Sequence, residues 1–264
     1  MNTEYEYLLL SNKDGVTTIT LNNPDKLNAL NLDMEKELLR ALRYVRDDNK
    51  SKVIIITGKG EKAFCAGADI RIFDEISSIK GYHLMRDPGY EVHRLMEIME
   101  KPLIAAVNGY CLAGGLEIAL ACDLIIAGDG AVFGLPEINI GIIPGWGGCV
   151  RLARALGARG AKKWIMTGKQ VGAKEAKESG LIYKLVEKNA LMDEAMKLAS
   201  ELTSKAPNAL KMAKMVINYS LECSDMDAAL SIERGAISAL MGSEDCAEGV
   251  AAFLEKRKPE FRGI

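Results

Sequence analysis

Two glutamates stand alone in segments that are otherwise apolar or rich in glycine. Glu117 lies in the run Ala113–Cys122, where every other side chain is small or apolar. Glu137 follows in the glycine-rich segment Phe133–Gly145. An ionised carboxylate is costly to bury without a partner, so isolated acids of this kind are typical of sites with a shifted pKa. Two such carboxyl groups can divide the roles of acid and base over one water molecule or substrate.

Each glutamate also has a purely structural interpretation. Glu117 could pair with an arginine or lysine from elsewhere in the chain, and Glu137 could cap its local turn. Under that interpretation, a Glu→Gln change at either position alters stability more than turnover. The residues alone leave both alternatives open.

Glycines place unhindered backbone amides near the first acid. Gly114 and Gly115 open a predicted helix that carries Glu117, and they leave the amides of its first turn accessible. Such amides can hold a negatively polarised oxygen. The small-residue loop Gly60–Ile70 offers a second set of amides after a buried strand. Neither segment has a phosphate-binding motif, because G-x-x-x-x-G-K-[ST] and G-x-G-x-x-G are both absent.

The elements that must position these residues alternate between strands and helices. Two β-rich runs, Tyr5–Leu10 and Val16–Leu21, flank an Asp-Gly pair and predict a β-hairpin. The spacing of apolar residues in Asn31–Asp47 predicts an amphipathic helix capped by Asn31. Short apolar runs predict buried strands at Val53–Thr57, Leu103–Val107 and Leu124–Ala127. Helical patterns then recur at Leu191–Thr203, Asn208–Tyr219, Met226–Leu240 and Asp245–Lys256.

The composition of the 264 residues excludes several classes of protein. Lys+Arg number 34 against 36 Asp+Glu, for a net charge of −2, which disfavours nucleic acid or an anionic membrane as partner. The longest apolar stretches are far shorter than the ~18–20 residues that span a bilayer. The first residues show no signal or transit pattern, so we expect a cytoplasmic protein. Scattered cysteines and two histidines predict no metal site.

Three segments together resemble the crotonase (enoyl-CoA hydratase/isomerase) superfamily, namely Ala66–Asp69, Ile104–Asp123 and Phe133–Gly145. The resemblance extends to Ala252–Lys258 and covers essentially the whole chain. It implies an α/β fold, a crotonase-like spiral of repeated ββα units over residues 1–200. A helical C-terminal region, residues 201–264, would then drive assembly into homotrimers or dimers of trimers. The implied substrate is an acyl-CoA thioester; CoA is part of the substrate, and no separate cofactor is expected.

The resemblance also implies a role for each matched residue. The amides of Ala68 and Gly114 would form an oxyanion hole that polarises the thioester carbonyl. Glu117 would activate the water that adds at C3, and Glu137 would exchange the proton at C2. The positions matched to the binding of CoA and of the acyl chain are Lys62, Ala66, Asp69, Ile70, Arg71 and Trp146, with Phe253 and Lys256 reaching the CoA of a neighbouring subunit.

Possession of both acids favours hydration among the reactions of this superfamily. The expected activity is an enoyl-CoA hydratase of β-oxidation type, which converts a short-chain 2-trans-enoyl-CoA to the 3-hydroxyacyl-CoA. The alternatives are an enoyl-CoA isomerase and a hydratase of cyclic or branched enoyl-CoA. A non-catalytic RNA-binding role is disfavoured by the balanced charge.

Two residues depart from the pattern of many hydratases. Leu135 stands where many of them have glutamine, so the hydrogen bonding that orients Glu137 differs. Trp146 occupies a position that is often small or phenylalanine. We hypothesise that its indole shortens the acyl tunnel and favours short or compact acyl groups.

Overall fold

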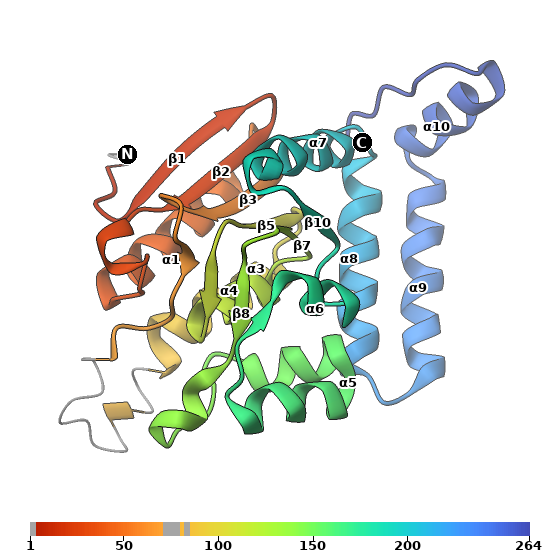
Figure 1. The fold of residues 1–264 in the computed structure, drawn as a ribbon. Coiled ribbons are helices and arrows are strands. Elements are labelled where there is room, and N and C mark those ends of the chain that lie inside the picture. Colours follow the sequence, from red (N-terminus) through yellow and green to blue (C-terminus); the bar gives the residue numbers. More distant parts are fainter. Residues whose placement is uncertain (1–3, 71–79, 82–84) are drawn as a thin grey trace.

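The chain folds around two sheets in a computed structural model that describes residues 4–70, 80–81 and 85–264 (Figure 1). Within these residues the larger sheet has six strands in the order β1-β2-β3-β5-β7-β10. β1 and β2 pair antiparallel, whereas the other neighbouring strands pair in parallel. The strands are β1 (Leu8–Lys13), β2 (Val16–Leu21), β3 (Val53–Gly58), β5 (Leu103–Val107), β7 (Leu124–Gly128) and β10 (Lys184–Val186).

Within the described residues the smaller sheet contains four strands. Its order is β4-β6-β8-β9, with the bounds β4 (Ala63–Cys65), β6 (Tyr110–Leu112), β8 (Val132–Gly134) and β9 (Val171–Gly172). Each of the pairs β3–β4, β5–β6 and β7–β8 therefore contributes one strand to each sheet. A helix follows each pair: α3 (Glu91–Ile98), α4 (Gly114–Ala121) and α5 (Gly148–Thr167). This is the repeated ββα arrangement that the resemblance implies.

The first hairpin and helix form as the local sequence predicts. The turn between β1 and β2 uses positive φ angles at Asp14 and Gly15, as a tight hairpin requires. The first strand begins at Leu8 rather than Tyr5. In α1 (Leu32–Asp47), the backbone N–H of Met34 donates to the side-chain oxygen of Asn31 at 2.7 Å.

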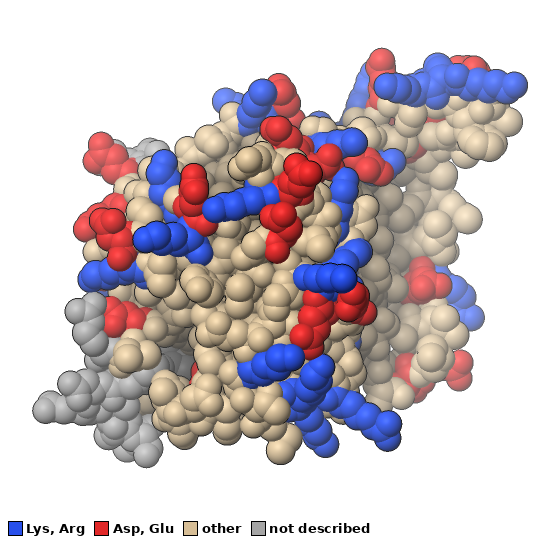
Figure 2. Space-filling view, viewed as in Figure 1, with Lys and Arg blue, Asp and Glu red and all other residues tan. Residues whose placement is uncertain are grey.

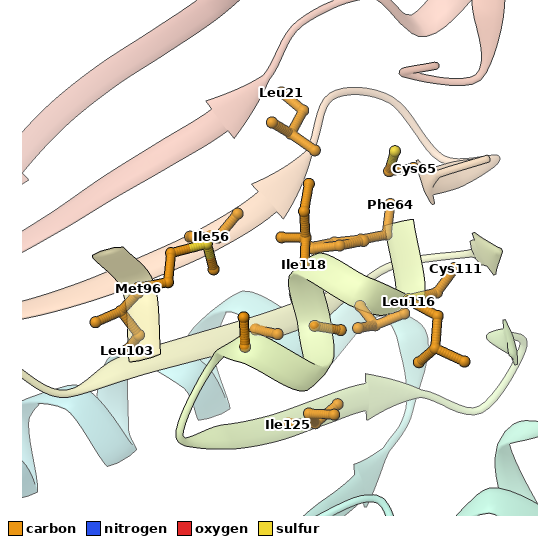
Figure 3. Packing of buried hydrophobic residues seen from close by; sticks show 14 of the residues in the cluster. Leu21, Ile56, Phe64, Cys65, Met96, Leu103, Cys111, Leu116, Ile118 and Ile125 are labelled. Atoms are coloured by element: carbon orange, nitrogen blue, oxygen red, sulfur yellow. The ribbon is translucent and has the colours of Figure 1, made fainter. Parts of the chain in front are cut away.

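Helix α4 lies inside the core between the sheets. In the close-up of the packing, Ile118 projects from it toward Phe64, whereas Leu116 lies on the side of Cys111 (Figure 3). A Cβ atom on Gly115 would collide with the backbone carbonyl oxygen of Cys65, so the helix begins directly against the end of β4. Because α4 is enclosed on all sides, every polar group on it needs a partner supplied by tertiary structure.

The C-terminal part of the chain is helical. α7 (Leu191–Thr203) covers the second face of the large sheet, and α8 (Pro207–Glu222), α9 (Met226–Met241) and α10 (Glu244–Glu255) follow it (Figure 1). These bounds lie within three residues of the predicted ones. The predicted division between residues 200 and 201 falls inside α7, and the division into two units stays a prediction.

The sequence analysis did not predict α5. This helix contains several glycines, and its backbone is non-helical at Gly157, where φ is 69°. Glycine lowers helix propensity by about 1 kcal/mol per residue, which hides the helical pattern. Tertiary contacts of the buried Leu152 and Trp164 compensate for it.

On the face that Figure 2 shows, basic and acidic side chains lie close together over the upper part, and a group of lysines and arginines lies at the lower edge. Among the described residues, no helix combines the length and the apolar character needed to span a bilayer.

Candidate active site

Glu117 projects from the first turn of α4 and is 2% exposed. Its Oε1 atom accepts hydrogen bonds from two backbone amides, those of Trp146 at 2.8 Å and Gly148 at 2.7 Å. Burial raises the pKa of Glu117, while these two amides and the charge of Arg151 oppose the rise. Among the described residues no salt bridge to Glu117 is formed, and its hydrogen-bond partners are two backbone amides.

Glu137 lies in the short 3-10 helix η4 (Pro136–Ile140), and its Oε2 atom is buried without a hydrogen-bond partner among the described residues. Burial, together with the nearby charge of Glu117, raises the pKa of Glu137 to about 7. The two carboxyl groups therefore lie close enough to influence each other. A carboxyl group with a pKa near neutrality is suited to both giving and taking a proton.

The amides expected to polarise a carbonyl lie on adjoining backbone segments. Gly67 has a φ of 103°, and a Cβ atom there would lie 2.6 Å from the Cβ of Ala113 and 3.4 Å from the nitrogen of Gly114. The loop of Ala68 thus packs on the start of α4. Within the described part of the chain, neither the Ala68 nor the Gly114 amide donates to another protein group. Two free amides on touching segments form a suitable pair of donors for one oxygen.

Trp146 lies directly against Gly114. A Cβ atom on Gly114 would lie 2.7 Å from Cζ3 of the indole, so a larger residue would displace it. The indole also stacks on His93, with ring centroids 5.6 Å apart. Burial lowers the pKa of His93 to about 4, and its Nδ1 atom lies 2.7 Å from the carbonyl oxygen of Gly89. His93 is therefore neutral and donates from Nδ1 to that carbonyl.

The remaining predicted binding residues are dispersed. Lys62 is exposed just before β4, and Ile70 is exposed after the loop that carries Ala68; Ala66 and Asp69 are partly buried within that loop. The backbone amides of Ala66 and Asp69 donate to Leu27 and Leu30, which fixes the loop on the segment before α1. Arg71 lies outside the described residues.

Phe253 and Lys256 lie far from the two glutamates in the same chain. They belong to α10 and its C-terminal end, which projects beyond α8 and α9 (Figure 1). Phe253 is 81% exposed, although it is a large apolar side chain. Only the Phe253 and Lys256 of another subunit could contact a substrate bound at Glu117.

The groups that hold Glu117 were not predicted from the sequence. The amides of Trp146 and Gly148 donate to it and the charge of Arg151 lowers its pKa against the effect of burial, and none was assigned that role. A Cβ atom on Gly148 would lie 3.0 Å from Oε1 of Glu117, so glycine permits the short contact. The glycines that follow Glu137 in the sequence indicated that another group approaches the backbone closely there. They do not specify that this group is the carboxylate of Glu117.

Comparison with known proteins adds independent evidence. Residues 11–263 match the family model described as enoyl-CoA hydratase/isomerase. A short-chain-enoyl-CoA hydratase of Clostridium acetobutylicum is 42% identical over 259 residues, which cover 97% of this chain and 98% of that protein. A crotonyl-CoA hydratase of Syntrophomonas wolfei is 40% identical over 257 residues, with 97% and 98% covered.

The fold is likewise similar to solved structures. A crystal structure of an enoyl-CoA hydratase from Bacillus anthracis superimposes with a TM-score of 0.94 at 35% identity, covering 98% of this chain and all of that one. The crotonase-like spiral expected from the sequence is therefore confirmed.

Proposed function

Since the chain belongs to the enoyl-CoA hydratase/isomerase family, we propose that it is an enoyl-CoA hydratase acting on short-chain 2-trans-enoyl-CoA. The observation that carries the proposal is the pair of buried carboxyl groups, Glu117 and Glu137, where burial and the charge of the first raise the pKa of the second, together with two amides that donate to no other group among the described residues. Relatives named for hydration of short-chain enoyl-CoA and crotonyl-CoA support the choice of reaction.

In the proposed reaction the amides of Ala68 and Gly114 donate to the thioester oxygen and stabilise the enolate-like charge that develops there. Glu117 accepts a proton from the water that adds at C3. Glu137 delivers a proton to C2. The thioester itself accepts the electron density, so the proposal requires no metal and no separate cofactor.

The decisive experiment follows the ultraviolet absorbance of the conjugated thioester after protein is added to crotonyl-CoA. Rapid loss of absorbance, with 3-hydroxybutyryl-CoA as product, supports hydration. No loss with crotonyl-CoA would contradict the proposed substrate. Product analysis with 3-enoyl, cyclic and branched enoyl-CoA then separates isomerisation and other hydrations from the proposed reaction.

We further propose that Trp146 limits the length of the acyl group, because its indole fills the space beside Gly114. Trp146→Ala is expected to raise the ratio of kcat/KM for octenoyl-CoA over crotonyl-CoA by about tenfold or more, since each methylene in an apolar pocket is worth about 10-fold or more in discrimination. Trp146→Phe should give an intermediate ratio. Equal rates from four to eight carbons in the wild type, unchanged in Trp146→Ala, would contradict this role.

We also propose that the protein is a homotrimer or a dimer of trimers. Side chains of α8, α9 and α10 line a groove of about 540 Å³, and the exposed apolar side chains of Phe253 and Leu254 belong to its lining. A second exposed apolar group, which includes Ile140 and Ile143, lies near Glu137. Two different apolar surfaces on one chain suit head-to-tail contacts that close into a ring.

Analytical ultracentrifugation tests this assembly directly. We expect a mass of three or six chains for the wild type and a smaller mass for the double variant Phe253→Glu, Leu254→Glu. A monomeric wild type at micromolar concentration would contradict the proposal.

A further inference from the structure

Arg151, in the first turn of α5, lies behind the turn that holds Glu117. Its Nη1 atom donates to the carbonyl oxygen of Trp146 at 2.7 Å, and its backbone N–H donates to the carbonyl oxygen of Gly147 at 2.8 Å. A Cβ atom on Gly147 would collide with Nη1, so the guanidinium rests directly against this turn. The carbonyls of the turn are thus bound to Arg151, while the amides of Trp146 and Gly148 donate to Glu117.

Glu97 of α3 fixes the guanidinium of Arg151. The Nη2 atom of Arg151 donates to Oε2 of Glu97 at 3.0 Å, and both side chains are largely buried. Arg94 binds the same carboxylate at 3.0 Å, and Arg154 lies 3.7 Å from its other oxygen. Burial opposes the ionisation of Glu97, but Arg151 and Arg94 outweigh it and lower the pKa of Glu97. The anchor of Arg151 is therefore an ionised carboxylate.

We propose that Arg151 is a positioning residue for Glu117. Held by Glu97, it fixes the turn at residues 146–148 so that two amides converge on Oε1, and its positive charge favours the ionised carboxylate. This inference rests on the proposed function, in which Glu117 acts as the base. It assigns Arg151 no contact with the substrate.

The charges around Glu117 set the sign of the expected pH effect. Burial raises the pKa of Glu117, and the amides of Gly148 and Trp146 and the charge of Arg151 lower it. Among the described residues, the other titratable side chains on elements packed against α4 include Glu137 and Cys149, which feel the charge of Glu117, and the buried His93 of α3, Cys65 of β4 and Cys111 of β6. Burial keeps the histidine and the three thiols uncharged near neutral pH. Loss of Arg151 would therefore raise the pKa of Glu117.

The test compares Arg151→Gln with wild type over a range of pH. We expect kcat for crotonyl-CoA hydration to fall about 10- to 100-fold, because small displacements of a reacting group have effects of this size. The acid limb of kcat/KM should move to higher pH, with KM little changed. Arg151→Lys should restore the acid limb but only part of kcat, since an ammonium group cannot span both Trp146 and Glu97.

Arg154→Gln provides a matched control. Arg154 also carries a guanidinium on α5 and lies near Glu97, but among the described residues its guanidinium makes no hydrogen bond to the turn at 146–148, whereas that of Arg151 does. This variant is expected to leave both kcat and the pH profile unchanged. An equal shift in Arg154→Gln, or an unmoved acid limb in folded Arg151→Gln, would overturn the proposal.

A readout without turnover separates this inference from the proposed function. Infrared titration of the Glu117 carboxyl, identified by its loss in Glu117→Gln, should give a higher pKa in Arg151→Gln than in wild type. That result holds even if crotonyl-CoA proves to be the wrong substrate. If Arg151→Gln fails to fold, Arg151→Lys decides the question, because wild-type kcat in that variant would overturn the positioning role.

Discussion

Glu117→Gln is expected to reduce kcat for hydration of crotonyl-CoA by about 10²-fold or more. The amide of glutamine keeps the size of the side chain but cannot accept the proton from water. The amide oxygen of glutamine can still occupy the Oε1 position and accept hydrogen bonds from the amides of Trp146 and Gly148, so the fold should persist. Ultraviolet assays that follow the absorbance of crotonyl-CoA measure the decrease in kcat, and circular dichroism checks the fold.

Glu35→Gln serves as the control for Glu117→Gln. Glu35 is equally enclosed in α1, and burial raises its pKa to about 8, so it is also a buried acid without an ion pair among the described residues. It has no place in the proposed reaction, and its variant should retain kcat. If Glu117→Gln instead lowers Tm strongly and changes kcat less than about threefold, the structural interpretation of Glu117 is correct.

Glu137→Gln is expected to abolish exchange at C2 and to reduce hydration by about 10²-fold or more. The pKa of Glu137 is about 7, so the carboxyl is protonated below that pH and can deliver its proton to C2. In wild type, kcat/KM for hydration should therefore fall as pH rises through about 7, whereas kcat/KM for dehydration should rise. Glu137→Gln should lose this dependence. Rates measured in both directions, with deuterium incorporation at C2 in D₂O, test each part.

The same carboxyl links stability to pH. The pKa of Glu137 is higher in the folded chain than in the unfolded one, so the stabilisation present at low pH is lost as pH rises through about 7. Glu137→Gln does not ionise and should have a higher Tm than wild type at pH 8 but not at pH 5. Hydration that persists at wild-type rates in the folded variant would contradict the role of Glu137 as acid.

Local sequence patterns were sufficient to predict most of the helices and strands and to identify Glu117 and Glu137 as candidate site residues. The hairpin at Asp14 and Gly15, the capped helix after Asn31 and the long C-terminal helices follow from turn chemistry, capping and apolar spacing, which act over a few residues. Glu117 and Glu137 were visible for the same reason, because a lone acid in an apolar segment is a local pattern. The joint motifs then indicated the family, and the reaction followed from the presence of both acids.

Only the tertiary structure decided what holds those acids. The two donors to Glu117 are backbone amides of residues 146 and 148, and nearly every residue carries such an amide, so no residue type identifies them. The same holds for Arg151, which acts through a carbonyl, and for Glu97, which reaches it from another helix. The sequence gives side-chain type and spacing directly. The direction in which a backbone N–H or C=O group points, and the groups that surround a buried charge, are set only when distant segments pack together.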